Sequence, residues 1–203
     1  MKSFKTVAHS SKAEYTDRRS VFYGYAAPSA TEEEALQFLA NIRKIHSDAT
    51  HNVYAYIIRG GISRFSDDGE PHGTAGLPVL DVLRKEDITD TIIVVTRYFG
   101  GTLLGTGGLV RAYTAAAKAA VDLAGIKTAR ACVRFRLACS YSDFQRLAKL
   151  FENYGVSRVS PEYLESIIVT ACCPETDYPT FCTDVKDTTG GRSLPEEIDL
   201  IYD

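Results

Sequence analysis

The sequence lacks the features that mark membrane, secreted and metal-binding proteins. No apolar run approaches the ~20 residues that a membrane-spanning helix needs, and the first residues, MKSFK, lack the apolar block of a signal peptide. The five cysteines lie in the C-terminal third without CxxC spacing, which favours buried free thiols over a zinc site or a disulfide framework. We therefore expect a cytoplasmic protein without membrane contact, metal or cofactor.

An excess of positive charge is also missing. Lys and Arg number 23 against 26 Asp and Glu, so the formal net charge is −3. Proteins that bind nucleic acid usually carry a basic excess, and any RNA contact here would need a local cluster of Arg and Lys. Hydrophobic residues make up 45% of the chain and charged residues 24%, as in ordinary globular proteins, so a buried core is expected.

The first part of the chain predicts strands alternating with helices. A β-rich segment at 20–26 precedes a helix that begins at Thr31, where Glu34 completes a capping box and Ile45 ends the apolar face. Two further strands, joined by a glycine turn, and a short apolar helix are expected at 53–58, 62–65 and 75–84.

The strongest strand and the longest helix follow. Residues 91–96 are apolar throughout rather than alternating, which predicts a central strand covered on both faces. The helix after them has an apolar stripe that begins with Leu109 and Val110, and Gly125 is placed to end it. Its many alanines would let its backbone lie close to the sheet.

A second, smaller domain is expected after residue 128. Its order of elements is β-α-β-β-α-β, the split βαβ or ferredoxin-like pattern, with Ser142 and Gln145 capping the first helix. The predicted fold is therefore α+β with two domains, 1–128 and 129–203. Strands are expected at 131–138, 156–163, 165–172 and 197–202, and the second helix at 176–187.

An acidic, turn-rich segment contains the first candidate site residues. Asp67, Asp68 and Glu70 supply oxygen atoms of the kind that bind magnesium or calcium, but their spacing is not that of an EF-hand loop. Asp and Gly also form turns for purely local reasons, and we favour that interpretation. His72, near Thr74, would need a partner to act as a general acid or base, and the sequence places none.

A glycine-rich segment contains the second set. Residues 97–111 run from the buried strand into the long helix, whose first backbone N–H groups can bind an anion. Arg97 and Arg111 can add charge-assisted bonds, and Thr106 can cap the helix or contact a ligand. The pattern is neither a Walker A loop nor a dinucleotide fingerprint. A tight strand-to-helix connection in which glycine serves only packing remains an equal alternative.

Two further residue types bear on chemistry. His51 precedes a predicted strand, but the chain shows no nucleophile signature to accompany it, so a structural or surface role is favoured. Tyr98 and Phe99, beside the glycines, can offer a stacking surface for bases. We assign no catalytic residue, and an enzyme is the less favoured class.

Four segments in order across residues 19–113 resemble blocks of the YigZ/IMPACT family. SDDGEPHGTAG at 66–76 resembles its SDDGEPxGTAG block, and RYFGGTLLGTGGLVRAY at 97–113 resembles its RYFGGxxLGxGGLxxAY block. ATHNVYAY at 49–56 is similar to its AxHxxxAY segment, and RSVF at 19–22 to its KSxF segment. Val21 and Leu77 stand where the family often has basic residues, and Arg18 and Arg19 are placed to replace part of that charge.

The resemblance implies a fold and a class of function. The N-terminal domain would have the ribosomal-protein-like fold of domain IV of elongation factor G, and the second domain would be the ferredoxin-like domain of the family's bacterial branch. Eukaryotic members are tied to the control of translation under amino-acid starvation through protein partners. The residues then expected on one binding surface are His51, Asp67, Asp68, Glu70, His72, Thr74, Arg97, Tyr98, Gly100, Gly101, Thr106, Gly107, Gly108 and Arg111.

Three functions follow, in order of preference. The first is a regulatory module that binds RNA, the ribosome or a translation factor. The second is a protein-interaction regulator without nucleic-acid contact, and the third is an enzyme acting on a small phosphorylated or nucleotide-like ligand. Contacts to a phosphate backbone weaken steeply with salt, which separates the first function from the other two.

Overall fold

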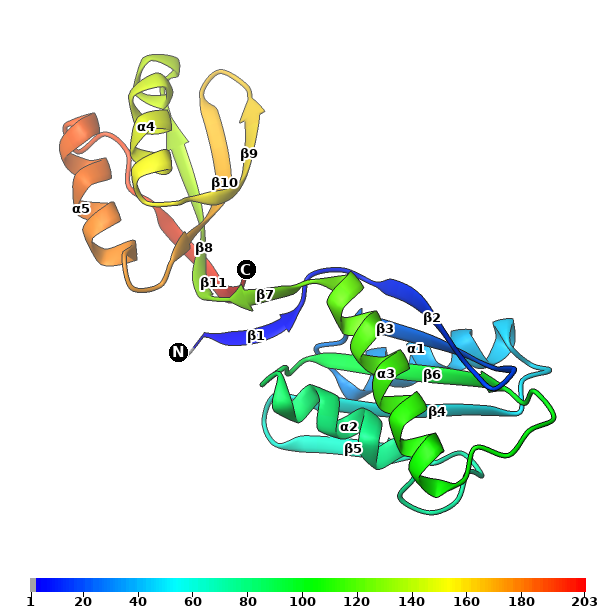
Figure 1. Ribbon diagram of the computed structural model, residues 1–203. Helices are drawn as coiled ribbons and strands as arrows, with labels where there is room; N and C mark the ends of the chain where they lie inside the picture. Colours follow the sequence, from blue (N-terminus) through cyan, green and yellow to red (C-terminus); the bar gives the residue numbers. More distant parts are fainter. Residues whose placement is uncertain (1–2) are drawn as a thin grey trace. The chain divides into compact units, whose positions relative to one another are not determined.

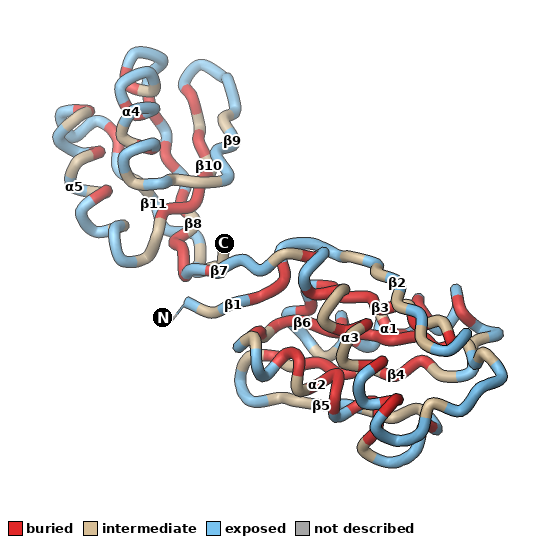
Figure 2. The backbone as a smooth tube through the Cα atoms, in the orientation of Figure 1, coloured by how far each residue is buried: buried red, intermediate tan, exposed pale blue. Residues whose placement is uncertain are grey.

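A computed structural model describes residues 3–203, which form two compact units, Phe4–Thr128 and Ala129–Asp203 (Figure 1). Each unit has its own sheet and its own buried core (Figure 2). The predicted α+β class is confirmed. Within the described residues, no helix combines the length and apolar character needed to cross a bilayer.

The N-terminal unit is built on a five-stranded antiparallel sheet with the order β2-β3-β6-β4-β5. Its central strand, β6, is buried along its length except at Tyr98, as the unbroken apolar run predicted. A separate pair joins β1 to β7. The strands are β1 (Phe4–Val7), β2 (Ser11–Asp17), β3 (Ser20–Pro28), β4 (His51–Ile58), β5 (Ile62–Ser66), β6 (Thr91–Tyr98) and β7 (Ile126–Ala129).

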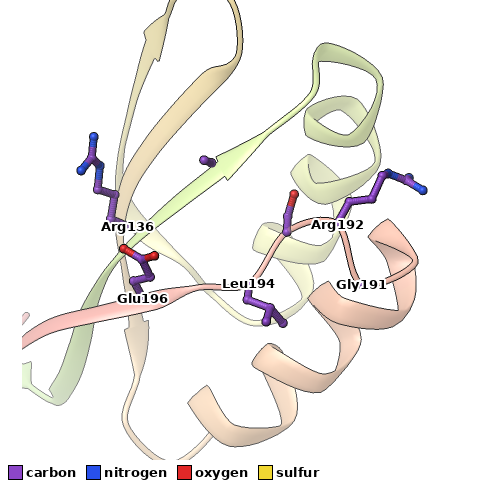
Figure 3. A pocket seen from close by; sticks show the side chains of 7 residues that line it. Arg136, Gly191, Arg192, Leu194 and Glu196 are labelled. Carbon is purple, nitrogen blue, oxygen red and sulfur yellow. The ribbon is translucent and has the colours of Figure 1, made fainter.

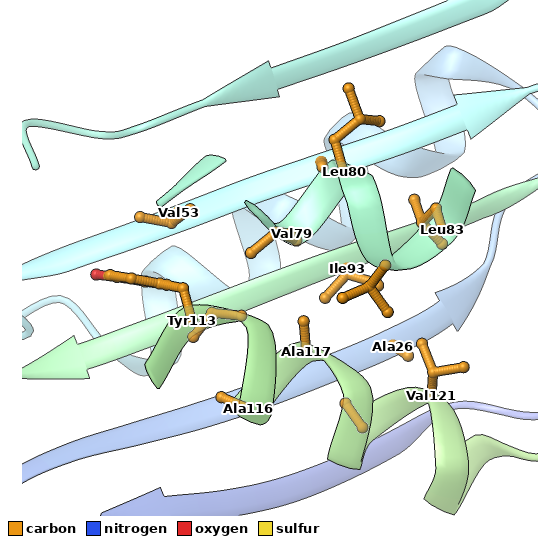
Figure 4. Close-up of a cluster of buried hydrophobic side chains, with 14 of the residues drawn as sticks. Ala26, Val53, Val79, Leu80, Leu83, Ile93, Tyr113, Ala116, Ala117 and Val121 are labelled. Carbon is orange, nitrogen blue, oxygen red and sulfur yellow. The ribbon is translucent and has the colours of Figure 1, made fainter. Parts of the chain in front are cut away.

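Three helices cover the two faces of this sheet. The helices are α1 (Glu32–Ile45), α2 (Gly76–Lys85) and α3 (Thr106–Ala124). Apolar side chains of α1 share a core with Ile92 and Val94 of β6, whereas α2 and α3 pack on the other face with Ile93 and Val95 (Figure 4). Alternate residues of β6 therefore serve two separate cores, because successive side chains of a strand point to opposite faces.

Helix α3 lies unusually close to the sheet. A Cβ atom at Gly24 of β3 would lie 2.2 Å from the carbonyl oxygen of Ala116, so only glycine fits at this crossing. Ala116, Ala117 and Ala120 are fully buried along the helix (Figure 4). The predicted close approach of an alanine-rich helix is confirmed.

Several local expectations were wrong. Ile45 and Val110 were placed on buried faces, but they are 67% and 37% exposed, because each lies beyond the stripe that contacts the sheet. Strands β1, β2 and β7 were not predicted. In β2, alternate residues such as Lys12 and Glu14 are exposed at the sheet edge, so its hydrophobic content is too low to mark it as a strand.

The C-terminal unit is ferredoxin-like, as predicted. Its sheet is antiparallel with the order β11-β8-β10-β9, and its two helices pack against each other and against one sheet face. All five cysteines are free thiols, and only Cys182 is partly exposed. The elements are β8 (Ala131–Cys139), α4 (Tyr141–Asn153), β9 (Ser157–Tyr163), β10 (Ile167–Pro174), α5 (Tyr178–Thr189) and β11 (Glu196–Tyr202).

The N-cap of α4 differs from the expected one. Ser140, rather than Ser142, accepts the capping bond, from the backbone N–H of Asp143 at 3.1 Å. Ser142 lies inside the first turn, so the capping box with Gln145 does not form. At α1 the expected cap is present, because Thr31 accepts from the N–H of Glu34 at 3.2 Å.

A buried histidine lies on the α1 side of the sheet. The His46 ring lies 2.6 Å from the Tyr25 hydroxyl through Nε2 and 2.9 Å from the Tyr98 hydroxyl through Nδ1. Burial, reinforced by the charge of Lys12, lowers the pKa of His46 below 6.5, although Asp48 acts in the opposite direction. The unfolded chain therefore binds this proton more readily than the folded one.

We predict that His46→Gln reduces the loss of folding stability as the pH falls. Neutral His46 contributes stability above its unfolded pKa of about 6.5, and this contribution is lost as the pH falls below that value. Thermal unfolding from about pH 8 to pH 5.5 should therefore show a larger loss for the wild type than for the variant. Parallel curves for the two proteins would show that His46 does not control this slope.

Candidate functional site

The acidic turn (residues 66–76) and the strand that leads into the glycine-rich loop (residues 99–105) are joined by a buried ion pair. Arg97 Nη1 donates to Glu70 Oε1 at 2.6 Å, and the two side chains are only 6% and 3% exposed. The Tyr113 hydroxyl of α3 donates to the same oxygen at 2.7 Å. Burial first, and then the charge of Glu70, raise the pKa of Tyr113, so it remains a hydrogen-bond donor.

The Arg97 side chain keeps one donor without a partner. Its Nη2 lies 3.5 Å from Ser20 Oγ, and its guanidinium carbon lies 5.5 Å from the Phe22 ring and 5.4 Å from the Phe99 ring. Its Nε atom is buried and makes no hydrogen bond within the described residues. A buried donor left unpaired is unfavourable by about 1–3 kcal/mol.

His51 faces this pair from the neighbouring strand. It is opposite Arg97 in the β4–β6 register. Its Nδ1 lies 2.8 Å from the carbonyl oxygen of Asp68, which can only accept, so the proton of the neutral ring belongs on Nδ1. Nε2 is then an acceptor, 3.8 Å from Glu70 Oε1.

A pocket of about 420 Å³ opens above these groups. This volume lies in the range of sites that bind small organic molecules. Most of its walls are apolar, and its polar groups are gathered at His51, Glu70, Arg97 and the first residues of α3. Pro71, Phe99, Leu103, Leu104 and Leu109 form the apolar walls.

The carboxylates of the acidic turn point to different partners. Asp67 accepts from the backbone N–H groups of Gly73, Ala75 and Gly76 at 2.7–3.2 Å, and so occupies the N-terminus of α2. Asp68 accepts from the N–H of Asn52 at 2.7 Å and pairs with Arg43 at 2.8 Å. Within residues 3–203, no group of three His, Cys, Asp or Glu side chains is arranged to hold a metal ion.

These bonds explain the ionisation of Asp67. Burial opposes its charge, but the three backbone donors outweigh burial and, with His72 nearby, lower the pKa of Asp67 below 3.8. His72 itself lies 3.6 Å away with a side chain that is 99% exposed. Thr74 donates its hydroxyl to the carbonyl of Pro71 at 2.6 Å and closes the turn. Asp67 and Thr74 thus have structural roles.

The glycines of the glycine-rich segment have different surroundings. Gly100 packs so tightly that a Cβ atom would lie 2.0 Å from the backbone of Arg19, whereas Gly101 has a φ of +81° and open space. Gly107 and Gly108 lie in the first turn of α3, where Thr106 makes no capping bond and Gly105 is the N-cap. Backbone N–H groups at the start of α3 thus lie beside the pocket without a side-chain cap.

Of the residues expected on one surface, His51, Glu70, Arg97 and Thr106 line the pocket, and the others do not. Tyr98 points to the α1 side of the sheet, where its hydroxyl donates to Asp48 at 2.9 Å, so it cannot stack beside Phe99. Arg111 is exposed on α3 and does not line the pocket. Ser20 and Tyr113 were not predicted as site residues. Both lie in matched blocks, but their roles depend on contacts with distant residues.

The C-terminal unit has a second hollow of about 420 Å³ between β8 and the segment that leads into β11 (Figure 3). Arg136 and Glu196 lie on one side of it, and Leu194 lies on the other. Arg192 extends away and donates to the buried carboxylate of Asp143 at 2.9 Å. We assign no function to this hollow, because Arg192 is already paired with Asp143.

Comparison with known proteins identifies relatives of both units. Two family models match, the Impact N-terminal domain over residues 18–121 and a domain of unknown function, DUF1949, over residues 137–192. The IMPACT family member YvyE of Bacillus subtilis is 34% identical over 98% of this chain and 93% of its own length. YigZ of Escherichia coli is 29% identical over 86% of this chain and 87% of its own length.

A solved crystal structure of a hypothetical protein resembles this chain. It superposes on this chain with a TM-score of 0.65 and 28% sequence identity, and the match covers 98% of each chain. The likeness therefore extends across both units rather than over the matched blocks alone.

We predict that Asp67→Ala destabilises the N-terminal unit by about 1–2 kcal/mol, as loss of an N-terminal cap does. Hydrogen exchange of the β6 amides measures this change in the free energy of unfolding. The difference should shrink as the pH falls below about 3.8, because a carboxylate with a lowered pKa contributes stability only while it is ionised. Asp81→Ala, on the exposed side of α2, is the matched control and should change little. Equal effects of the two substitutions would contradict the capping role.

Proposed function

The chain belongs to the IMPACT family, and from this premise we propose that it is a regulatory protein that binds RNA of the translation machinery. The contact surface is the end of the N-terminal unit where the β2–β3 turn meets the glycine-rich loop. The ribosome is the RNA-containing partner that we would test first.

The observation that carries this proposal is the β2–β3 turn. Asp17 pairs with Ser20, so the turn consists of Arg18 and Arg19 alone. Their φ angles are +44° and +69°, values that a two-residue hairpin requires and that favour Asn and Gly. Two arginines in this conformation are unfavourable by roughly 1 kcal/mol or more each. Residues that hold a strained conformation at a surface are candidates for function.

The charges at this end support the same proposal. Arg18, Arg19 and Arg111 are exposed, and within residues 3–203 none of them forms an ion pair with a carboxylate. The acidic turn does not neutralise them, because Asp67 binds backbone N–H groups and Glu70 binds Arg97. A chain with a net charge of −3 can thus still present a local cationic surface.

The turn is also held against the glycine-rich loop. The backbone N–H of Gly100 donates to Ser20 Oγ at 3.2 Å, and Gly100 packs directly on the Arg19 backbone. The two arginines therefore have a defined position beside the uncapped start of α3. Backbone N–H groups at a helix start and arginine side chains both favour phosphate oxygens.

We predict that Arg18→Asn with Arg19→Gly makes the protein more stable and weakens its binding to ribosomes. Asn and Gly relieve the strained turn, so the unfolding midpoint should rise. Loss of two phosphate contacts should make the slope of log affinity against log salt shallower by about 1.4–1.8. Co-sedimentation with ribosomes across a salt series measures the binding.

A matched control removes two other exposed arginines, Arg64 and Arg84, and changes the net charge equally. It should leave binding and its salt slope nearly unchanged. If both variants lose ribosome binding equally, the contact depends only on overall charge and not on the β2–β3 turn. If the wild type does not bind ribosomes at low salt, the proposal is wrong. Binding that does not respond to salt would favour a protein-interaction regulator instead.

A further inference from the structure

We propose that the pocket beside the Arg97–Glu70 pair receives a single unstacked nucleobase of the bound RNA. This inference rests on the proposed function. It concerns how the protein holds a base of the RNA rather than its phosphates. Proteins that read single-stranded RNA commonly turn a base out of the strand, stack it on an aromatic side chain and hydrogen-bond its edge. The pocket supplies each of these elements.

The walls suit a flat, weakly polar ring. Phe99 lines the pocket and is 47% exposed, and Leu103 is 82% exposed at its rim. Exposed apolar side chains that are grouped in a hollow, as here, are typical of ligand-binding sites. One base covering the Phe99 ring would bury both surfaces, and such stacking does not depend on base identity.

The polar floor offers both a donor and an acceptor. Arg97 Nε is a buried N–H without a partner, on a residue that is 5% exposed and lines the pocket. His51 Nε2 is an acceptor in the neutral ring, because Nδ1 faces the Asp68 carbonyl. The Watson–Crick edge of every base carries a donor and an acceptor side by side, which is the pattern that this pair of atoms complements.

A phosphate fits the same floor poorly. The charge of Arg97 is already offset by Glu70 at 2.6 Å, and an anion above the pair would also face that carboxylate. Apolar walls would strip water from a phosphate without replacing its hydrogen bonds. A nucleobase is neutral, so it meets neither penalty.

The geometry of the chain allows both contacts at once. Gly100 packs on Arg19, and Phe99 and Leu103 flank the same loop at the mouth of the pocket. Phosphates on Arg18 and Arg19 would therefore lie within a short stretch of RNA from a base in the pocket.

The test uses the full chain with leucine methyl groups labelled for NMR. Each of the four nucleosides is titrated separately, with inorganic phosphate as the anion control. At least one nucleoside should shift the methyl signals of Leu103 and Leu104, which line the pocket outside α3, and phosphate should not. Phe99→Ala should lower the affinity for that nucleoside about ten-fold, the order expected for loss of one stacked aromatic ring. Phe65→Ala is the matched control, since Phe65 is similarly exposed, at 41%, outside the pocket, and it should change nothing.

A short single-stranded RNA then separates this inference from the proposed function. Phe99→Ala should weaken RNA binding without changing its salt slope, whereas Arg18→Asn with Arg19→Gly changes the slope. If Phe99→Ala binds RNA as tightly as the wild type, the base pocket is wrong and the arginine surface stands. If nucleosides shift the methyl signals but RNA does not bind, the pocket stands and the RNA proposal fails. The pocket is also overturned if no nucleoside shifts the signals, or if phosphate alone reproduces the shifts.

Discussion

The N-terminal unit depends on one buried ion pair at the end of its sheet. Placing two charges out of water is unfavourable by several kcal/mol for each ion, and only a close partner with further hydrogen bonds compensates. Arg97 and Glu70 meet this condition at 2.6 Å, and Tyr113 supplies the additional donor. Because these residues come from β6, the acidic turn and α3, their contact holds three distant segments together and sets the floor of the pocket.

The same end of the unit shows why its charges cannot be judged from composition. The acidic turn is the most carboxylate-rich part of the matched blocks, yet its oxygens are used within the protein. Asp67 takes the place of a capping side chain for α2, and Glu70 neutralises Arg97. The arginines of the β2–β3 turn are left exposed, and none of the described residues supplies them with a carboxylate partner. An acidic chain can therefore offer a cationic edge, because buried partners cancel one set of charges and leave the other.

Much of the fold could be predicted because its signals are local. The apolar run of β6, the alanine stripe of α3 and the β-α-β-β-α-β order each follow from periodicity within a single segment. The errors occurred where a local rule allowed more than one outcome. Two serines near the start of α4 can serve as caps, and only Ser140 does. Val110 is adjacent to the apolar stripe of α3, but it lies beyond the residues that contact the sheet and is 37% exposed.

The sequence by itself determined all elements except β1, β2 and β7, the two-unit organisation of the α+β fold and the family, because periodicity, capping and motif blocks are properties of neighbouring residues. Only the tertiary structure decided which polar groups meet. It brought Glu70 to Arg97 across 27 positions, left Arg97 Nε without an acceptor and turned Tyr98 to the other face of the sheet. The physical reason is that strand register and helix packing choose these partners, and neither is recorded in the spacing of residues along the chain.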